Sequence, residues 1–235
     1  MIHPKVIICE SPDGLLSSAA KDFAELLNEL AATKRGPIRV ILTGGTLGIA
    51  FIRQIDQLDL DLSEVWFMFG DERYVGLEDP DRNEYQGLSQ MADQSRYNLI
   101  RYPDGTGDLD SAGREFSLQL SEELGDISSP EAVFDLVILG VGPDGHVASL
   151  FPGHLHENGW IVAESDSPKP PPKRLSLSYQ ALNKADNLWV LASGEAKANV
   201  VSDALNNPGC ELPLSKVSGK KQTRWYLDQE LSDAL

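Results

Sequence analysis

The sequence VILTGGT, at residues 40–46, joins a short apolar run directly to a turn with two glycines, and a helical pattern follows. The same alternation recurs along the chain. We expect further strands at residues 6–9, 65–69, 134–139, 175–178 and 188–192, and helices that begin near Pro12, Thr46 and Glu195. Continuous apolar strands that alternate with helices are typical of a parallel sheet covered on both faces. The sequence therefore predicts an α/β fold, a three-layer α/β/α sandwich with a mostly parallel sheet.

Length and charge narrow the class of protein further. The chain has 235 residues, which we interpret as one domain spanning residues 1–235, and its 20 Lys and Arg stand against 36 Asp and Glu, for a net charge of −16. Nucleic acid or an anionic membrane would need a basic face, so we expect neither as a partner. A small anionic substrate stays possible if a few cations converge in a cleft.

Cysteine use and hydropathy favour the cytoplasm. Cys9 and Cys210 are far apart and in no metal-ligand spacing, so we expect free thiols in a reducing compartment. The apolar run at 6–9 is too short for a signal peptide, and no run approaches the length of a membrane span. Two connecting segments are also expected: an exposed loop at 102–113, and a stiff, extended connector with four prolines at 167–173.

Ligands of open parallel sheets bind beyond the carboxyl ends of the strands, so the turns after strands are the places to search. The first candidate turn is Thr43-Gly44-Gly45-Thr46. Its glycines let the backbone approach a ligand, and the N–H groups of a helix start attract phosphate. The turn lacks the Gly-Lys-Ser/Thr ending of a nucleotide P-loop. The alternative is a tight turn with a threonine cap.

The second candidate turn, Phe69 to Tyr74, contains Asp71 and Arg73 at the end of an apolar strand. These two side chains could place a carboxylate and a guanidinium on a substrate. A solvated ion-pair loop is the alternative, and the spacing does not decide between them.

The third candidate turn is GVGPDGHVASLFPG, at residues 140–153. It matches Gly-x-Gly-x-x-Gly formally, but Pro152-Gly153 would break the long helix that a dinucleotide site requires. We instead expect a flexible turn that presents Asp144 and His146 together. An imidazole oriented by a carboxylate can act as a general base, and the alternative is a structural histidine. His154 and His156 lack metal-ligand spacing relative to His146, so no metal is expected.

Two cations lie near the same expected edge of the sheet. Arg174 begins the run at 175–178, and Lys197 lies in the first turn of the helix that begins near Glu195. Both could neutralise a phosphate, although each taken alone could equally be a surface charge.

These motifs together resemble the 6-phosphogluconolactonase family, within the glucosamine-6-phosphate isomerase/deaminase-like superfamily. The similar stretches run in the family order and cover most of the chain: LTGGTLG (42–48), FGDERYV (69–75), LGVGPDGHVASLFPG (139–153), PPKRLSLSY (171–179) and SGEAKANVV (193–201). The resemblance implies a modified Rossmann-like fold of the sugar-phosphate isomerase/deaminase type. It also implies hydrolysis of 6-phosphoglucono-δ-lactone to 6-phosphogluconate, the second step of the oxidative pentose phosphate pathway, without metal or cofactor.

The resemblance also implies roles for individual residues. His146 would activate water, with Asp144 orienting it. Arg174 and Lys197 would bind the phosphate, and Thr43, Gly44 and Gly45 would line the cradle for the sugar phosphate. Asp71 and Arg73 resemble active-site residues as well, with Arg73 the better candidate for contacting substrate oxygens.

The sequence departs from the family pattern in one stretch, and two alternative functions are considered beside the lactonase. Val75-Gly76 and Arg82-Asn83 stand where family members often have Val-Pro and Ser-Asn, so Asn83 is not assigned to the site. The deaminase/isomerase branch typically carries a catalytic Glu where this chain has Phe151, which favours the lactonase. The other rival is a sugar-phosphate binding protein without catalysis. For the chain itself we expect a monomer or a small homo-oligomer.

Overall fold

The computed structural model describes residues 3–207 and 209–235. Its main sheet has seven strands in the order β1-β10-β9-β6-β2-β3-β5, and every neighbouring pair is parallel. The strands are β1 (Lys5–Cys9), β2 (Ile38–Leu42), β3 (Val65–Phe69), β5 (Asn98–Leu99), β6 (Phe134–Gly140), β9 (Ala185–Ala192) and β10 (Gln222–Asp228). Side chains of both faces of β2 and β6 are buried, which is why these strands are continuous apolar runs.

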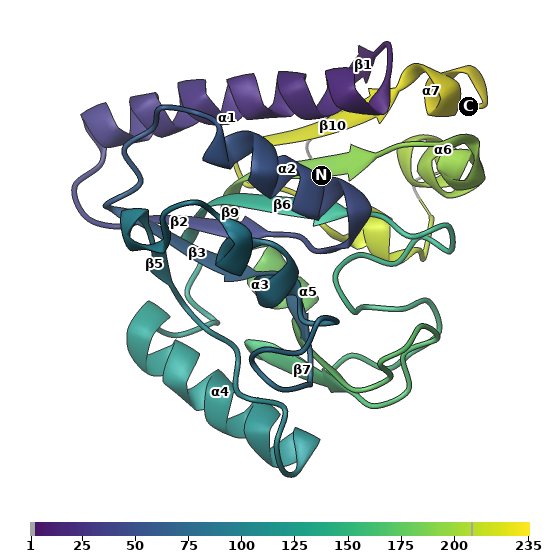
Figure 1. Ribbon diagram of the computed structural model, residues 1–235. Coiled ribbons are helices and arrows are strands. Elements are labelled where there is room, and N and C mark those ends of the chain that lie inside the picture. Colours follow the sequence, from purple (N-terminus) through teal and green to yellow (C-terminus); the bar gives the residue numbers. More distant parts are fainter. Residues whose placement is uncertain (1–2, 208) are drawn as a thin grey trace.

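Helices cover this sheet on both sides (Figure 1). Helices α1 and α2 pack against each other and against strands of the main sheet. Helix α4 lies on the opposite side, where it packs against residues 161–164 and 174–177. The helices are α1 (Pro12–Thr33), α2 (Gly45–Asp56), α3 (Asn83–Gln86), α4 (Leu109–Leu124), α5 (Tyr179–Leu182), α6 (Ala198–Asn206) and α7 (Gln229–Asp233). The predicted α/β class with a mostly parallel sheet is therefore confirmed.

The first helix begins where the sequence predicts. Ser11 is the N-cap and its side chain accepts a hydrogen bond from the Gly14 N–H, while Pro12 occupies the first helical position. Proline suits that position because its missing N–H would have no partner within the helix. The apolar stripe of α1 is buried against the sheet through Leu15, Leu16, Ala19, Ala20, Phe23 and Leu27.

One predicted strand lies elsewhere than expected. The run at 175–178 belongs to β8 (Arg174–Leu177), which is the centre of a separate three-stranded sheet with β4 (Asp71–Arg73) and β7 (Ile161–Glu164). Both pairings in this sheet are antiparallel. An apolar run alone does not distinguish a strand of the main sheet from a buried strand of a second one.

The prediction of a loop at 102–113 is wrong from residue 109 onward. Helix α4 begins at Leu109, and the side chain of Asp108 caps it by accepting a hydrogen bond from the Ser111 N–H at 2.9 Å. An Asp followed by helix-forming residues is a start signal, and the Gly and Asp content of the preceding residues obscured it. In the part of the chain that the structure describes, no helix is both long and apolar enough to span a membrane.

Candidate active site

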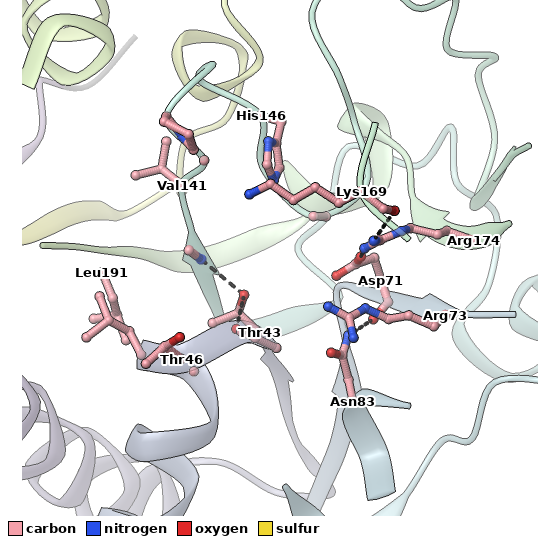
Figure 2. Close-up of a pocket in the computed structure, with 18 of the residues that line it drawn as sticks. Thr43, Thr46, Asp71, Arg73, Asn83, Val141, His146, Lys169, Arg174 and Leu191 are labelled. Atoms are coloured by element: carbon pink, nitrogen blue, oxygen red, sulfur yellow. Dashed lines mark hydrogen bonds and ion pairs between the residues drawn. The ribbon is translucent and has the colours of Figure 1, made fainter. Parts of the chain in front are cut away.

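A pocket of about 340 Å³ lies at the carboxyl ends of the main-sheet strands. Figure 2 shows side chains from several segments directed into it. The turn after β2, strand β4, the turn after β6, the proline-rich connector and the start of α6 all contribute. The residues that carry polar or charged side chains into the lining are Thr43, Thr46, Asp71, Arg73, Asn83, His146, Lys169, Arg174 and Lys197.

His146 and Asp144 form the pair that the sequence predicts. The His146 Nδ1 lies 2.5 Å from the Asp144 Oδ1. Burial opposes ionisation of Asp144, but the charge and hydrogen bonds of His146 outweigh it and lower the pKa of this carboxyl below its ordinary value. A carboxylate only accepts hydrogen bonds, so Nδ1 carries the hydrogen of this bond, and Nε2 is the ring nitrogen that can accept a proton when the ring is neutral. His146 lines the pocket, whereas Asp144 supports it from outside the lining.

The backbone of the turn after β6 fixes this ring. A Cβ at Gly142 would lie 2.1 Å from the His146 Cε1, so only glycine leaves room for the imidazole. The Gly142 N–H donates to the His146 carbonyl at 3.0 Å, which closes the turn. Two residues later Ala148 has φ +50°, a left-handed conformation that costs a non-glycine residue about 1–2 kcal/mol. Backbone geometry therefore determines where His146 points.

Phe151 packs against the imidazole ring of His146. The two ring centroids are 4.8 Å apart, and Phe151 is 3% exposed. Behind it, His154 lies 5.6 Å away between ring centroids, and its Nδ1 is 2.7 Å from the Glu164 Oε2. His154 and His156 do not line the pocket, and among the described residues no group of three His, Cys, Asp or Glu is arranged to hold a metal.

Asp71 ties the second sheet to the His146 turn. Its Oδ2 accepts a 2.6 Å hydrogen bond from the Ser149 hydroxyl, and the Ser149 N–H donates to the Ser176 Oγ of β8 at 3.2 Å. Ser149 is fully buried. Sequence reasoning missed this residue, although it lies within the quoted motif at 139–153. A polar residue inside the apolar run at 147–151 is the sequence signal that could have identified it.

Arg73 and Asn83 line the pocket, and each has one buried polar atom without a partner in the described chain. The Arg73 Nη1 donates to the Asp81 carbonyl at 2.5 Å, and its buried Nε has no partner among the described residues. Asn83 is 1% exposed and its Nδ2 donates to the Asp71 carbonyl at 2.9 Å. The Asn83 Oδ1 also lacks a partner in the described chain. The structure thus places Asn83 in the pocket, although the sequence analysis did not assign it there.

The turn after β2 forms the remaining wall. The Thr43 Oγ1 accepts a hydrogen bond from the Gly140 N–H at 3.1 Å, which ties the ends of β2 and β6 together. A Cβ at Gly44 would lie 2.0 Å from the Asn83 Oδ1, so glycine permits the close approach of these two segments. Gly44 is the N-cap of α2 and has no side chain to bind the first free N–H groups of the helix. Those N–H groups, together with the helix dipole, favour an anion.

Four cations and one carboxylate line the pocket. Burial lowers the pKa of Arg174, with Asp71 opposing that shift, and burial likewise lowers the pKa of Lys197, opposed by Asp228. Arg174 lies 3.7 Å from Asp71 through its Nη1 and the Asp71 Oδ2. This cationic pocket contrasts with a chain whose net charge is −16. Its charge suits a small anion held beside the imidazole of His146.

A scan against family models matches residues 10–225 to the family described as glucosamine-6-phosphate isomerases/6-phosphogluconolactonase. The chain belongs to this family. Curated members of the family include 6-phosphogluconolactonases of Streptomyces coelicolor, 33% identical with 99% of this chain and 95% of that protein covered, and of Mycobacterium tuberculosis, 33% identical with 95% of each covered.

Solved structures of the family share the fold. A 6-phosphogluconolactonase from Trypanosoma cruzi has a TM-score of 0.83 at 25% identity and covers 99% of this chain and 97% of its own. A monomeric glucosamine-6-phosphate deaminase has a TM-score of 0.77 at 22% identity and covers 98% of this chain and 100% of its own. The fold is therefore common to both branches, and the side chains of the pocket must decide between them.

Proposed function

We propose that the pocket hydrolyses 6-phosphoglucono-δ-lactone to 6-phosphogluconate. The observation that carries the proposal is the His146–Asp144 pair, which leaves the Nε2 of His146 free beside a cationic pocket. The family and the 33% identity to curated 6-phosphogluconolactonases support the same reaction. A pocket of about 340 Å³ is also of the size that small ligands occupy.

In the proposed reaction His146 removes a proton from water while the water oxygen bonds to the lactone carbonyl carbon. The carbonyl oxygen becomes an oxyanion, and Arg73 is the candidate to stabilise it, since its guanidinium belongs to the pocket lining. The oxyanion then re-forms the carbonyl as the ring C–O bond breaks, and the protonated imidazole returns its proton to the departing ring oxygen. Asp144 stabilises the imidazolium between these two steps.

The phosphate end is proposed to lie at the turn after β2. The free N–H groups at the start of α2, which follows the N-cap Gly44 and begins at Gly45, favour an anion there, as do the wall formed by Thr43 and the ammonium of Lys197. Arg174 adds positive charge to the same pocket, and Asp71 holds it in place.

Phe151 favours the lactonase over the deaminase branch. It stands where the resemblance places a catalytic Glu in deaminases, and it is buried against the His146 ring. A phenyl ring cannot transfer a proton, so the acid/base step of deamination has no residue there. We further propose that the enzyme acts in the cytoplasm on this small substrate, as a monomer or a small homo-oligomer, without nucleic acid as a partner.

The test is hydrolysis of freshly generated 6-phosphogluconolactone, corrected for spontaneous opening, with EDTA present. We expect rapid hydrolysis by the wild type and a loss of about 10²–10⁴-fold in kcat for His146→Ala, the range for removing a general base. His154→Ala is the matched control, because His154 is paired with Glu164 outside the pocket, and its activity should stay within about threefold of the wild type.

Each opposite result overturns a different part of the proposal. An active His146→Ala enzyme removes the general-base assignment. A wild type that does not accelerate hydrolysis removes the lactonase assignment, and glucosamine 6-phosphate then tests the deaminase. Binding of both compounds without turnover would indicate a sugar-phosphate binding protein.

A further inference from the structure

The proline-rich connector between β7 and β8 brings a fourth cation to the pocket. Lys169 and Pro170 both belong to the pocket lining. Figure 2 shows the Lys169 side chain directed into the pocket from the connector. Sequence reasoning treated this segment as a stiff connector only, and the role of Lys169 is open.

The guanidinium of Arg174 donates most of its hydrogen bonds to carbonyls of the connector. Its Nη2 donates to the Lys169 carbonyl at 2.9 Å and its Nε donates to the Pro171 carbonyl at 3.1 Å. The Nη1 is the nitrogen closest to Asp71, at 3.7 Å from its Oδ2. A planar guanidinium can hold several acceptors at fixed angles, which an ammonium cannot. Arg174 is 6% exposed, so these contacts are shielded from water.

A second contact fixes the same carbonyl. The Ser167 hydroxyl donates to the Lys169 carbonyl at 3.1 Å, and the Ser167 N–H donates to the Pro172 carbonyl at 3.1 Å. The backbone of Lys169 is therefore held from two sides, although its side chain is exposed. A side chain on a fixed backbone loses less entropy when it binds a ligand than one on a mobile loop.

The ammonium of Lys169 has no ion pair or hydrogen bond within the described chain, and the same is true of Lys197. The two lysines are close enough to interact: burial lowers the pKa of Lys197, the charge of Asp228 opposes that shift, and the charge of Lys169 lowers the pKa further. Two cations that form no ion pair within the described chain and converge on one pocket favour a ligand with two negative charges.

We propose that Lys169 binds the phosphate dianion of the substrate together with Lys197, and that Arg174 is a positioning residue that holds the connector so that Lys169 reaches the pocket. This inference rests on the proposed function for the identity of the sugar. The phosphate group itself is inferred from the two lysines and does not depend on the proposed function. In this proposal Arg174 is not a direct ligand of the phosphate. It positions Lys169, which is the ligand.

The first experiment compares Lys169→Gln with Lys173→Gln. Lys173 is an exposed lysine of the same connector that does not line the pocket, so it controls for the loss of one charge. For Lys169→Gln we expect KM for 6-phosphogluconolactone to rise about tenfold or more with kcat within about threefold, because a uniformly made binding contact is lost. Lys173→Gln should change neither. Equal KM values for the two variants overturn the proposal.

Calorimetry with inorganic phosphate separates this proposal from the lactonase assignment. Lys169→Gln should weaken phosphate binding about tenfold, and Lys173→Gln should leave it unchanged, whether or not the enzyme hydrolyses the lactone. Unaltered phosphate affinity in Lys169→Gln contradicts the inference even if the lactonase activity is established. An inactive wild type whose phosphate affinity still depends on Lys169 contradicts only the proposed reaction.

Arg174→Lys tests the positioning role, because it keeps the charge but cannot reach the carbonyls of Lys169 and Pro171 together. We expect it to raise KM about as much as Lys169→Gln, and the double variant to be no worse than either single one. A wild-type KM for Arg174→Lys would show that Arg174 acts through its charge alone. Multiplicative effects in the double variant would show that Arg174 acts independently of Lys169, and either result overturns the positioning role.

Discussion

The two sides of the pocket hold their functional groups by different physical means. On the side of the main sheet, the turn at 140–150 positions His146 through backbone geometry, with a glycine at 142 and a left-handed residue at Ala148. On the side of the second sheet, β4 and the segment at 82–84 are held by buried charges.

The buried charges form a compact group. Arg82 is completely buried and donates to the carbonyls of Tyr102, Pro103 and Val75 at 2.7, 3.1 and 3.2 Å. Its Nη2 is 3.4 Å from the Glu84 Oε2 and its Nε is 4.0 Å from the Glu72 Oε2.

Glu72 connects this group to the pocket. Its carboxylate accepts N–H hydrogen bonds from Arg73, Asn83 and Glu84 at 2.8, 2.7 and 2.9 Å. The backbone that carries Arg73 and Asn83 is therefore fixed by one carboxylate. Changes of charge should damage the second-sheet side, whereas changes of backbone freedom should affect the main-sheet side.

Arg82→Met gives the largest effect expected from this difference. It removes the donor to three buried carbonyls and leaves Glu72 and Glu84 without their buried cation, which costs about 3–5 kcal/mol of unfolding free energy. For a chain of this length we expect Tm to fall by about 10 °C. Urea denaturation followed by circular dichroism measures the loss.

Arg101→Met is the matched control for that change. Arg101 pairs with the same Glu84, Nε to Oε1 at 2.7 Å, but its side chain is 56% exposed. An exposed ion pair contributes about 1 kcal/mol or less. If both arginine variants lose the same stability, burial is not what makes the second-sheet side depend on charge.

The pH dependence of stability sharpens the same contrast. Burial raises the pKa of Glu72 from about 4.5 to about 7, against the N–H hydrogen bonds and the charge of Arg82. The folded protein therefore keeps a proton that the unfolded chain releases. The stability from this proton is fully present below pH 4.5 and is lost as the pH rises through about 7.

Glu72→Gln removes this titration. Between pH 5 and pH 8 the unfolding free energy of the wild type should fall relative to that of Glu72→Gln by about 2 kcal/mol. Urea denaturation at the two pH values gives the comparison, with the exposed Glu25→Gln of α1 as the control for a lost carboxylate. A difference that stays constant with pH, or grows toward pH 8, would contradict the raised pKa.

The same contrast explains what the sequence could predict. The central strands β2 and β6 are apolar because both of their faces are covered, and the neighbouring apolar strand Val65–Phe69 is predicted to the residue. The turns that follow them carry glycines and His146, which a reader of the sequence can recognise.

The second sheet offers no such pattern. Strand β4 consists of Asp71, Glu72 and Arg73, and its burial depends on partners that are distant in sequence, such as Arg82 and Ser149. Nothing in the order of the residues shows that a charged strand is buried. Asn83 and Lys169 reach the pocket for the same reason, through tertiary contacts of Glu72 and Arg174.

The smallest expected effect tests the main-sheet side through Ala148. Ala148→Gly relieves the left-handed strain at φ +50°, partly offset by the greater freedom of glycine in the unfolded chain, so we expect a gain of about 0.5–1 kcal/mol and a rise in Tm of about 2 °C. Because the Gly142–His146 hydrogen bond and Ser149 still hold the turn, kcat should stay within about threefold. Ala112→Gly within α4 makes the same chemical change at an ordinary helical position and should instead lower stability by about 1 kcal/mol. Thermal unfolding measures the Tm of both variants, and a rise for Ala148→Gly together with a fall for Ala112→Gly would show that the turn stores strain. A lower Tm for Ala148→Gly would mean that the alanine methyl group stabilises the turn through packing by more than its backbone conformation costs.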